Sequence, residues 1–356
     1  MYKNIRLVLI TSSLLLTSCL GTGPNESKDQ IPQSGSDQVI EGPWNSFDKN
    51  IFVGLEDTSN NGHIYELHFD NSATLGSALS VVRNSSITVG GRLRSLSMKN
   101  DGNIIVGGSG EVNPPIYAKD LSLVGSHSPT GASDPETNSH TVCTLPNGNY
   151  IVAEDTSSTG NAVNEYDSSD NFVRSVYTTV KGSNGTITQC IGVDNETIVW
   201  VETGAWGFTN SNLARIKLVN DAWSVEQVMD SESFDPGNGT NFWNLTVHSD
   251  GNIYFTPADR DGAKFNQLLR CPLNDISTTG CSAVGNPIPG VGSGNYLSWV
   301  RGIVQIPGSN DMLVFISQEV YHYNYSTGAY TSVMDLTSVL PSIDVVRSVI
   351  LAPKSN

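Results

Sequence analysis

The sequence predicts an all-β fold, and three features of its 356 residues lead to that prediction. Charged residues make up only 15% of the chain and glycine occurs 34 times, a composition poor in helix formers. No stretch of the body has the spacing of an amphipathic helix, whereas short β-branched and aromatic runs alternate with turn residues. The third feature, an internal repeat, specifies the architecture more closely than composition does.

The repeat is a hairpin in which two apolar strands flank a tight turn. Asp-Gly or Asn-Gly forms the turn in three of the five copies, and such turns need positive φ at both central residues. The copies are 95–108, 141–155, 188–203, 244–259 and 301–317. The strands expected after them are 115–121 and 122–128, 162–169 and 171–178, 213–220 and 222–229, 267–274 and 281–287, and 319–326 and 329–336. Four antiparallel strands per unit, recurring every 40 to 60 residues or so, predict the blades of a β-propeller.

The N-terminal unit lacks its opening strand, because 50–58, 63–70 and 73–82 supply only three strands. The C-terminal run VVRSVILAP (345–353) aligns with RLRSLSM and WVRGIVQ, which open other units. We therefore expect the last strand to complete the first blade and to close a ring of six four-stranded blades over residues 46–356. A pair of sandwiches and a seven-bladed ring with one degenerate blade are the alternatives.

The hairpins, with DGNIIV at 101–106 and DGNIYF at 250–255, resemble the inner hairpins of six-bladed propellers of the NHL-repeat and SMP-30/gluconolactonase type. The resemblance covers the whole body and is specific for the fold. It departs from the pattern where the Asp that usually follows the second strand is missing in the second and sixth blades. The gluconolactonase branch implies a divalent cation held by Glu, Asn and Asp, for which the chain offers Glu56, Glu154, Asp155 and Glu202.

The N-terminus has the layout of a secretory signal peptide. Lys3 and Arg6 precede a short apolar core, and Leu-Thr-Ser-Cys ends it at Cys19. This ending resembles the bacterial lipobox, which implies cleavage before Cys19 and its lipidation with acyl chains such as palmitate. The alternative is an ordinary signal peptide that contains a cysteine.

The resemblance divides the chain into a lipoprotein signal peptide (1–18), lipidated Cys19 with a flexible polar tether (19–45), and the propeller (46–356). Leu20 stands where inner-membrane lipoproteins have Asp, which favours the outer membrane, on either its periplasmic or its surface side. The net charge of −16 argues against nucleic acid as a partner. The expected partners are the membrane, through the lipid, and a protein or glycan.

Binding residues are expected on one face of the propeller. Antiparallel order places the tight hairpins at one end of the axis and the longer loops at the other, and long loops on a rigid scaffold usually carry binding. The candidates at that end are Arg94, His140, Arg301, Arg347, Glu154, Asp155, Glu202, Trp206, Trp243 and Trp299. A structural interpretation competes with this one: the arginines pair with carboxylates of neighbouring blades, and the aromatic rings wedge between blades.

The four cysteines after Cys19 permit two disulfides in an oxidising compartment. Cys271 and Cys281 lie in successive strands of one blade and are the favoured pair. Cys143 and Cys190 lie in adjacent inner strands, where they either bridge two blades or remain free. Without a Cys-x-x-Cys pair, and with its histidines scattered, the chain has no zinc-site pattern.

Catalytic signatures are missing from the sequence: it has no Gly-x-Ser-x-Gly elbow, His-Glu-x-x-His motif, phosphate loop or dinucleotide fingerprint. Arg94, Arg301 and Arg347 would also crowd a metal at the mouth with positive charge. The leading interpretation is therefore a lipid-anchored envelope or cell-surface binding or scaffold protein without a cofactor. The alternatives are a metal-dependent lactonase-like hydrolase and a purely structural subunit of an envelope complex.

Overall fold

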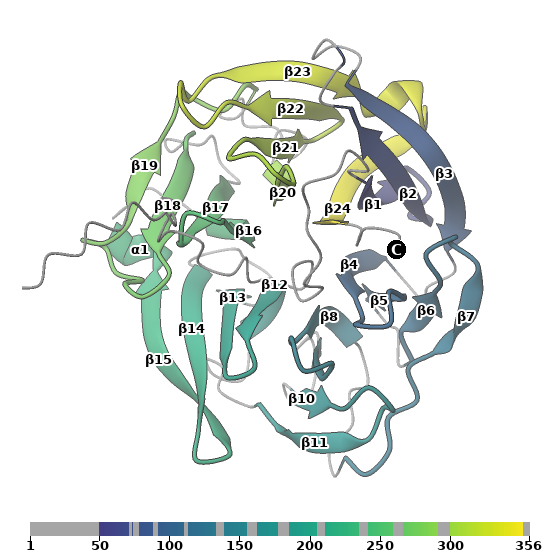
Figure 1. Ribbon diagram of the computed structural model, residues 1–356, viewed down its shortest axis with the longest axis vertical. Helices are drawn as coiled ribbons and strands as arrows, with labels where there is room; N and C mark the ends of the chain where they lie inside the picture. Colours follow the sequence, from purple (N-terminus) through teal and green to yellow (C-terminus); the bar gives the residue numbers. More distant parts are fainter. Residues whose placement is uncertain are drawn as a thin grey trace, which may run out of the picture.

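The computed structural model describes residues 50–70, 73, 78–87, 92–109, 113–132, 139–154, 162–176, 185–204, 211–234, 241–258, 266–290 and 300–351. Over these residues, six four-stranded antiparallel sheets stand in a ring around a central axis (Figure 1). The predicted six-bladed β-propeller is confirmed, and the sandwich and seven-bladed alternatives are wrong.

Each blade runs from an inner strand beside the axis to an outer strand at the rim (Figure 1). The first blade consists of β24 (Ile343–Leu351), β1 (Asn50–Asp57), β2 (Gly62–Phe69) and β3 (Leu79–Ile87). The second consists of β4 (Leu93–Met98), β5 (Ile104–Gly108), β6 (Pro115–Tyr117) and β7 (Leu123–Ser126), and the third of β8 (Ser139–Thr144), β9 (Tyr150–Glu154), β10 (Val163–Tyr166) and β11 (Phe172–Ser175).

The same order holds on the other side of the ring. The fourth blade consists of β12 (Gly185–Asp194), β13 (Thr197–Gly204), β14 (Ser211–Val219) and β15 (Ala222–Asp230). The fifth consists of β16 (Asn241–Val247), β17 (Asn252–Ala258), β18 (Leu268–Pro272) and β19 (Ser282–Val284), and the sixth of β20 (Val300–Gln305), β21 (Met312–Ile316), β22 (Glu319–Tyr323) and β23 (Tyr330–Asp335).

The C-terminal strand closes the ring as predicted. In Figure 1 the yellow β24 lies in the same blade as the purple β1, with which it pairs from Ile51↔Leu351 onward. Val346 and Val349 of β24 belong to one apolar cluster with Leu313 and Phe315 of the sixth blade. The closing strand is therefore held by hydrogen bonds on one side and by apolar packing against the neighbouring blade on the other.

One strand begins later than predicted. The third strand of the N-terminal unit is expected at 73–82 and is found at Leu79–Ile87. Its register explains the shift, because Phe69 pairs with Leu79 and Gly62 with Ile87, so the bounds of β2 set those of β3. Helical structure in the described residues is limited to α1 (Ser231–Phe234) and a 3-10 turn at Leu336–Ser338.

The Asp-Gly and Asn-Gly turns differ from the predicted type. Only the glycine, such as Gly102 with φ of 83°, takes positive φ, while Asp101 is not among the positive-φ residues. The Asp101 carboxylate accepts the Asn103 N–H at 2.9 Å, and the Gly102 N–H bonds to the Lys99 carbonyl at 2.8 Å. The turn is therefore a residue longer than a two-residue hairpin loop, with glycine at its one left-handed position.

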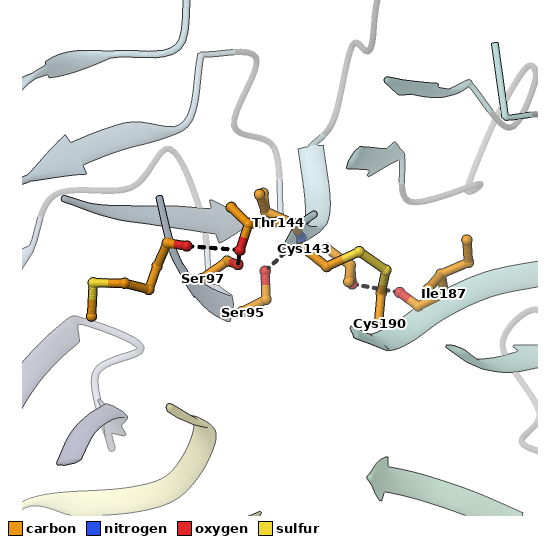
Figure 2. Close-up of a disulfide and its surroundings, with 9 residues drawn as sticks. Ser95, Ser97, Cys143, Thr144, Ile187 and Cys190 are labelled. Carbon is orange, nitrogen blue, oxygen red and sulfur yellow. Dashed lines mark hydrogen bonds between the residues drawn. A yellow bond between two sulfur atoms is a disulfide. The ribbon is translucent and has the colours of Figure 1, made fainter. Parts of the chain in front are cut away.

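Both disulfides are formed, including the pair that the sequence left open. Cys271 of β18 bonds to Cys281 next to β19, and Cys143 of β8 bonds to Cys190 of β12. Figure 2 shows the second bridge joining the inner strands of the third and fourth blades. Over the described ranges, no helix is long and apolar enough to cross a membrane.

Candidate ligand-binding mouth

All six inner strands carry a β-bulge at the same level. In the second blade, Leu93 pairs with Gly108 and Ser95 with Gly107, so Arg94 has no opposite residue. Such an extra residue bends its strand and re-aims a side chain out of the regular pleat. Aligned on these bulges, the six strands place one residue each at the same position, and we call this set the bulge ring. It consists of Arg94, His140, Thr188, Trp243, Arg301 and Arg347.

Four predicted binding residues stand on consecutive blades of the bulge ring. The inner strands β16, β20, β24 and β4 follow one another around the axis (Figure 1). They carry Trp243, Arg301, Arg347 and Arg94. Residues far apart in the sequence are thus brought together at one end of the axis, where three of the six ring positions are cationic.

Arg301 is the most buried of these cations, with 6% of its surface exposed. Burial lowers the pKa of Arg301 well below its usual value, and the nearby charges of Arg347 and Arg94 lower it further. Glu56 and Asp344 act in the opposite direction. The guanidinium lies over the Trp243 ring, 4.3 Å from its centroid, where the π-system stabilises the charge.

Arg347 is bound by a carboxylate of its own blade. Its Nε donates to Glu56 Oε2 at 2.9 Å and its Nη2 to Glu56 Oε1 at 3.0 Å, a two-pronged arrangement that fits guanidinium to carboxylate. Arg92 Nε lies 3.6 Å from the same Oε1. Arg347 is therefore paired with a carboxylate, as the structural interpretation predicts, but its partner lies on β1 of the same blade and not on a neighbouring blade. Glu56 is engaged by two cations and does not fit the role of a metal ligand.

Hydrogen bonds between inner strands fix the level of the bulges. They join five of the six seams between neighbouring blades, using the bulge residue or the one after it. The bonds are Leu96 N to Ser348 Oγ (3.0 Å), Val142 N to Ser95 Oγ (3.1 Å), Thr141 Oγ1 to Ile187 O (2.6 Å), Thr188 Oγ1 to Trp243 O (3.4 Å) and Asn244 Nδ2 to Arg301 O (2.8 Å). Figure 2 shows two of these seams around Ser95 and Ile187.

Two further predicted carboxylates, Glu154 and Glu202, lie in the third and fourth blades. Glu154 and Glu202 pair with Ser139 and Ile187, one residue before the bulges, and both are buried. Glu154 Oε2 accepts the Ala162 N–H at 3.2 Å. Within the described ranges, no three His, Cys, Asp or Glu side chains are grouped so that they could hold a metal ion.

Several predicted residues lie outside the described part of the chain. They are Cys19, Asp155, Trp206, Trp299 and the side chain of His140. The structure adds Arg92, Thr188 and Asp344, which sequence reasoning missed. Thr188 could have been found, because it aligns with Arg94 once the repeats are superposed; Arg92 and Asp344 carry no comparable signal.

Comparisons with known proteins place the chain by fold. No protein-family model and no curated protein sequence matches it. A protein of unknown function from Bacteroides caccae has a TM-score of 0.53 at 10% identity, covering 86% of this chain and 100% of that one. The periplasmic gluconolactonase PpgL of Pseudomonas aeruginosa has a TM-score of 0.56 at 11% identity, covering 86% and 99%.

A third structure, virginiamycin B lyase from Staphylococcus aureus, has a TM-score of 0.47 at 12% identity and covers 81% of this chain and 85% of that one. The likeness to the two structures with TM-scores above 0.5 is one of fold at these identities, and the predicted resemblance to gluconolactonase-type propellers is confirmed at that level. The chemistry of the mouth must therefore be argued from its own residues.

Proposed function

We propose that this protein binds an envelope partner at the bulge ring while a lipid at Cys19 holds it at the bacterial outer membrane. One observation carries the proposal: Trp243, Arg301, Arg347 and Arg94 occupy the same bulged position on four consecutive blades. A rigid ring that gathers cations beside an aromatic ring supports recognition of a polar partner, either a protein or a glycan.

The lactonase alternative has less support from the geometry. Of its four candidate ligands, Glu56 binds Arg347 and Arg92, and Glu154 bonds to a backbone N–H. Asp155 lies outside the described residues. Hydrolysis of small lactones by the full chain, measured with added calcium, magnesium or manganese and again with EDTA, tests this alternative directly. Metal-dependent turnover lost in Glu202→Gln would replace the binding proposal.

A photo-crosslinking experiment in intact cells tests the binding role. A photoreactive residue replaces Ser109, which bonds to Arg94 at the mouth, and is compared with the same residue at Val82 on the rim. We expect a discrete adduct only from the mouth. Arg94→Glu should abolish it, whereas Lys119→Glu, in the exposed turn between β6 and β7, should not. An adduct that is equally strong in both charge variants would overturn the proposal.

The anchor is tested separately from the ligand. Metabolic labelling with an alkyne-bearing fatty acid should mark the wild-type chain, and Cys19→Ser should remove the label and release the protein from the outer-membrane fraction. Labelling that survives in Cys19→Ser would contradict lipidation at this cysteine. Unlabelled wild-type protein would favour an ordinary signal peptide.

A further inference from the structure

The outer strands of the first two blades expose apolar side chains on neighbouring parts of the rim. Val81 and Val82 of β3 are 38% and 46% exposed, and Leu123 and Val124 of β7 are 65% and 59% exposed. We call these four residues the rim patch. β3 and β7 follow one another along the outside of the ring (Figure 1). An apolar patch on the surface of a soluble domain marks a site of contact with a protein or a membrane.

An electrostatic contact links the two strands that carry the rim patch. Hydrogen bonds from Ser122 lower the pKa of Asp120, and the charge of Arg83 lowers it further. Arg83 directly follows Val82 on β3, and Asp120 lies in the turn that leads into β7. Lys119, exposed in the same turn, brings a second cation to the border of the patch. Arg and Lys side chains of this kind can reach lipid phosphates while their stems lie on apolar surface.

The rim patch lies at the end of the axis opposite the mouth. Strand register in the first blade places Val81 level with Leu351, the last residue of β24. Register in the second blade places Leu123 level with Met98, the last residue of β4. The bulge ring lies four residues earlier on both inner strands. A surface that covers the patch therefore leaves the mouth uncovered.

Both strands have a β-bulge at the patch, which argues against an added strand as its occupant. Val82 of β3 and Val124 of β7 are extra residues with no opposite residue in the neighbouring strand. Bulges interrupt the regular row of backbone groups with which an extended peptide would pair. The occupant must therefore cover apolar side chains without continuing the sheet, and a lipid surface does so.

The predicted lipid anchor joins the propeller at the same end as the patch. Asn50, where the described chain begins, precedes Ile51, which pairs with Leu351 at the level of Val81. Residues 20–49 connect Asn50 to Cys19. Such a connection keeps the membrane at a high effective concentration near the patch, so that a small apolar area is enough to hold the contact.

We propose that the rim patch contacts the headgroup layer of the phospholipid membrane that holds Cys19. Val82, Leu123 and Val124 insert between the headgroups, at a depth where the backbone groups of the two outer strands still meet water and polar headgroups. The mouth stays clear of the bilayer and open to its partner. This inference rests on the lipid anchor of the proposed function and adds a second, apolar contact with the same membrane.

Fluorescence quenching in vesicles tests the contact. The full lipidated chain carries a dansyl-bearing amino acid in place of Val124 or, as a matched control, of Val228 on β15, which is 43% exposed. Each protein is inserted through its lipid into vesicles of phosphatidylethanolamine and phosphatidylglycerol with brominated acyl chains. We expect quenching at position 124 and none at 228, because bromine quenches only groups that reach the acyl region. No quenching at 124, or equal quenching at both positions, would overturn the inference.

Charged substitutions show whether the patch makes the contact. With the probe at position 124, Val82→Glu combined with Leu123→Glu should abolish quenching, since carboxylates are costly in the acyl region. Val219→Glu combined with Val225→Glu, at exposed positions of the fourth blade, should leave it unchanged. Leu123→Glu alone serves if the double variant lacks the native near-UV circular dichroism signal. Quenching that survives the charges in the patch would overturn the proposal.

The fatty-acid label and the quenching signal separate this inference from the function on which it rests. A chain that is labelled at Cys19 but not quenched at position 124 is anchored without lying on the membrane; the patch assignment fails and the anchor stands. Quenching in an unlabelled chain added to the vesicles would keep the patch as a membrane contact and remove the anchor. Loss of both signals overturns both.

Discussion

Glu56 is the residue on which the charge balance of the mouth depends. Its carboxylate is fully buried and binds Arg347 through both oxygens, with Arg92 also in range. A buried ion pair is of uncertain net benefit compared with apolar packing, but removing one partner strands the other charge. Removing either partner of the pair therefore destabilises the fold by more than the intact pair stabilises it relative to apolar packing.

Glu56→Gln should lower the free energy of unfolding by roughly 3–5 kcal/mol, because Arg347 stays buried without its counter-charge. Urea unfolding followed by near-UV circular dichroism measures the change. Glu226→Gln is the matched control, since Glu226 pairs with Arg215 at 3.0 Å but is 39% exposed; it should cost less than about 1 kcal/mol. Similar losses in the two variants would show that burial does not govern the Glu56 pair.

Asp57, the residue after Glu56 on β1, should make a contribution to stability that is lost at acidic pH. Burial raises its pKa, but hydrogen bonds from Asn61, His63 and Ser59 outweigh burial and lower the pKa to about 2, from 3.8. A carboxyl group with a depressed folded-state pKa stabilises the fold fully above its unfolded pKa, and the contribution is lost as pH falls through the folded value. The window of loss therefore lies between about pH 4 and pH 2.

Asp57→Asn should accordingly be less stable than wild type at pH 7, and the difference should shrink as the pH falls from about 4 toward 2. Urea midpoints measured across this range, for both proteins in the same buffers, give the comparison. A stability difference that stays constant down to pH 2 would mean that the ionised carboxylate is not the stabilising form.

At the scale of elements, the seams between inner strands hold the ring together. Five seams are joined by side-chain hydrogen bonds beside the bulges, and at the sixth, between β20 and β24, Gly302 replaces the polar residue. A Cβ on Gly302 would lie 2.3 Å from Val349 Cγ2. At the seam between β20 and β24, close packing of Gly302 against Val349 therefore takes the place of the side-chain hydrogen bond found at the other five seams.

Gly302→Ala should therefore destabilise the propeller by about 1–3 kcal/mol through overpacking. Gly125→Ala on β7 is the control, because nothing lies within 4 Å of the added methyl group. There the effect should be neutral or slightly stabilising, since glycine weakens a strand. Equal midpoints of thermal unfolding for the two variants would show that β24 shifts freely and that the seam is not tightly packed.

The two disulfides should differ in their contribution to stability. Cys143–Cys190 spans 47 residues and joins two blades, whereas Cys271–Cys281 spans 10 residues within one blade. Loop-closure entropy gives about 4 kcal/mol for the longer loop and about 3 kcal/mol for the shorter one. Paired alanine substitutions, compared by urea unfolding, should rank in that order. The reverse order would mean that native contacts outweigh chain entropy at these bridges.

The blades could be predicted from the sequence, but the bulges could not. The hairpins around Gly102, Gly148 and Gly251 repeat at regular spacing, and this period directly reports the four-stranded unit. A bulge adds one residue without changing composition, so Arg94 is identified as the extra residue only once its strand is paired with β5. Glu56 and Arg347 lie 291 residues apart, and no local pattern links them.

At the scale of the whole molecule, closure depends on one strand. β24 pairs with β1, packs against the sixth blade and contributes Arg347 and Ser348 to the mouth. Without it, β1 would present a long unpaired edge lined by Ile51 and Val53, which are fully buried in the closed ring. The ring is therefore a cooperative unit, because its first and last elements complete the same sheet.

Deleting residues 343–356 should leave a chain that does not reach the native near-UV circular dichroism signal and binds a hydrophobic dye, because the loss of β24 opens both the first blade and its seam with the sixth. Deleting 352–356 alone, after the end of β24, should leave the signal intact.

A synthetic peptide of residues 343–356 should restore the signal of the chain that lacks these residues, since it supplies the missing strand in trans. A Ser348→Ala peptide should do so less well, because it lacks the hydroxyl that accepts the Leu96 N–H at 3.0 Å. Native-like unfolding of the 343–356 deletion would show that five complete blades hold the ring without closure.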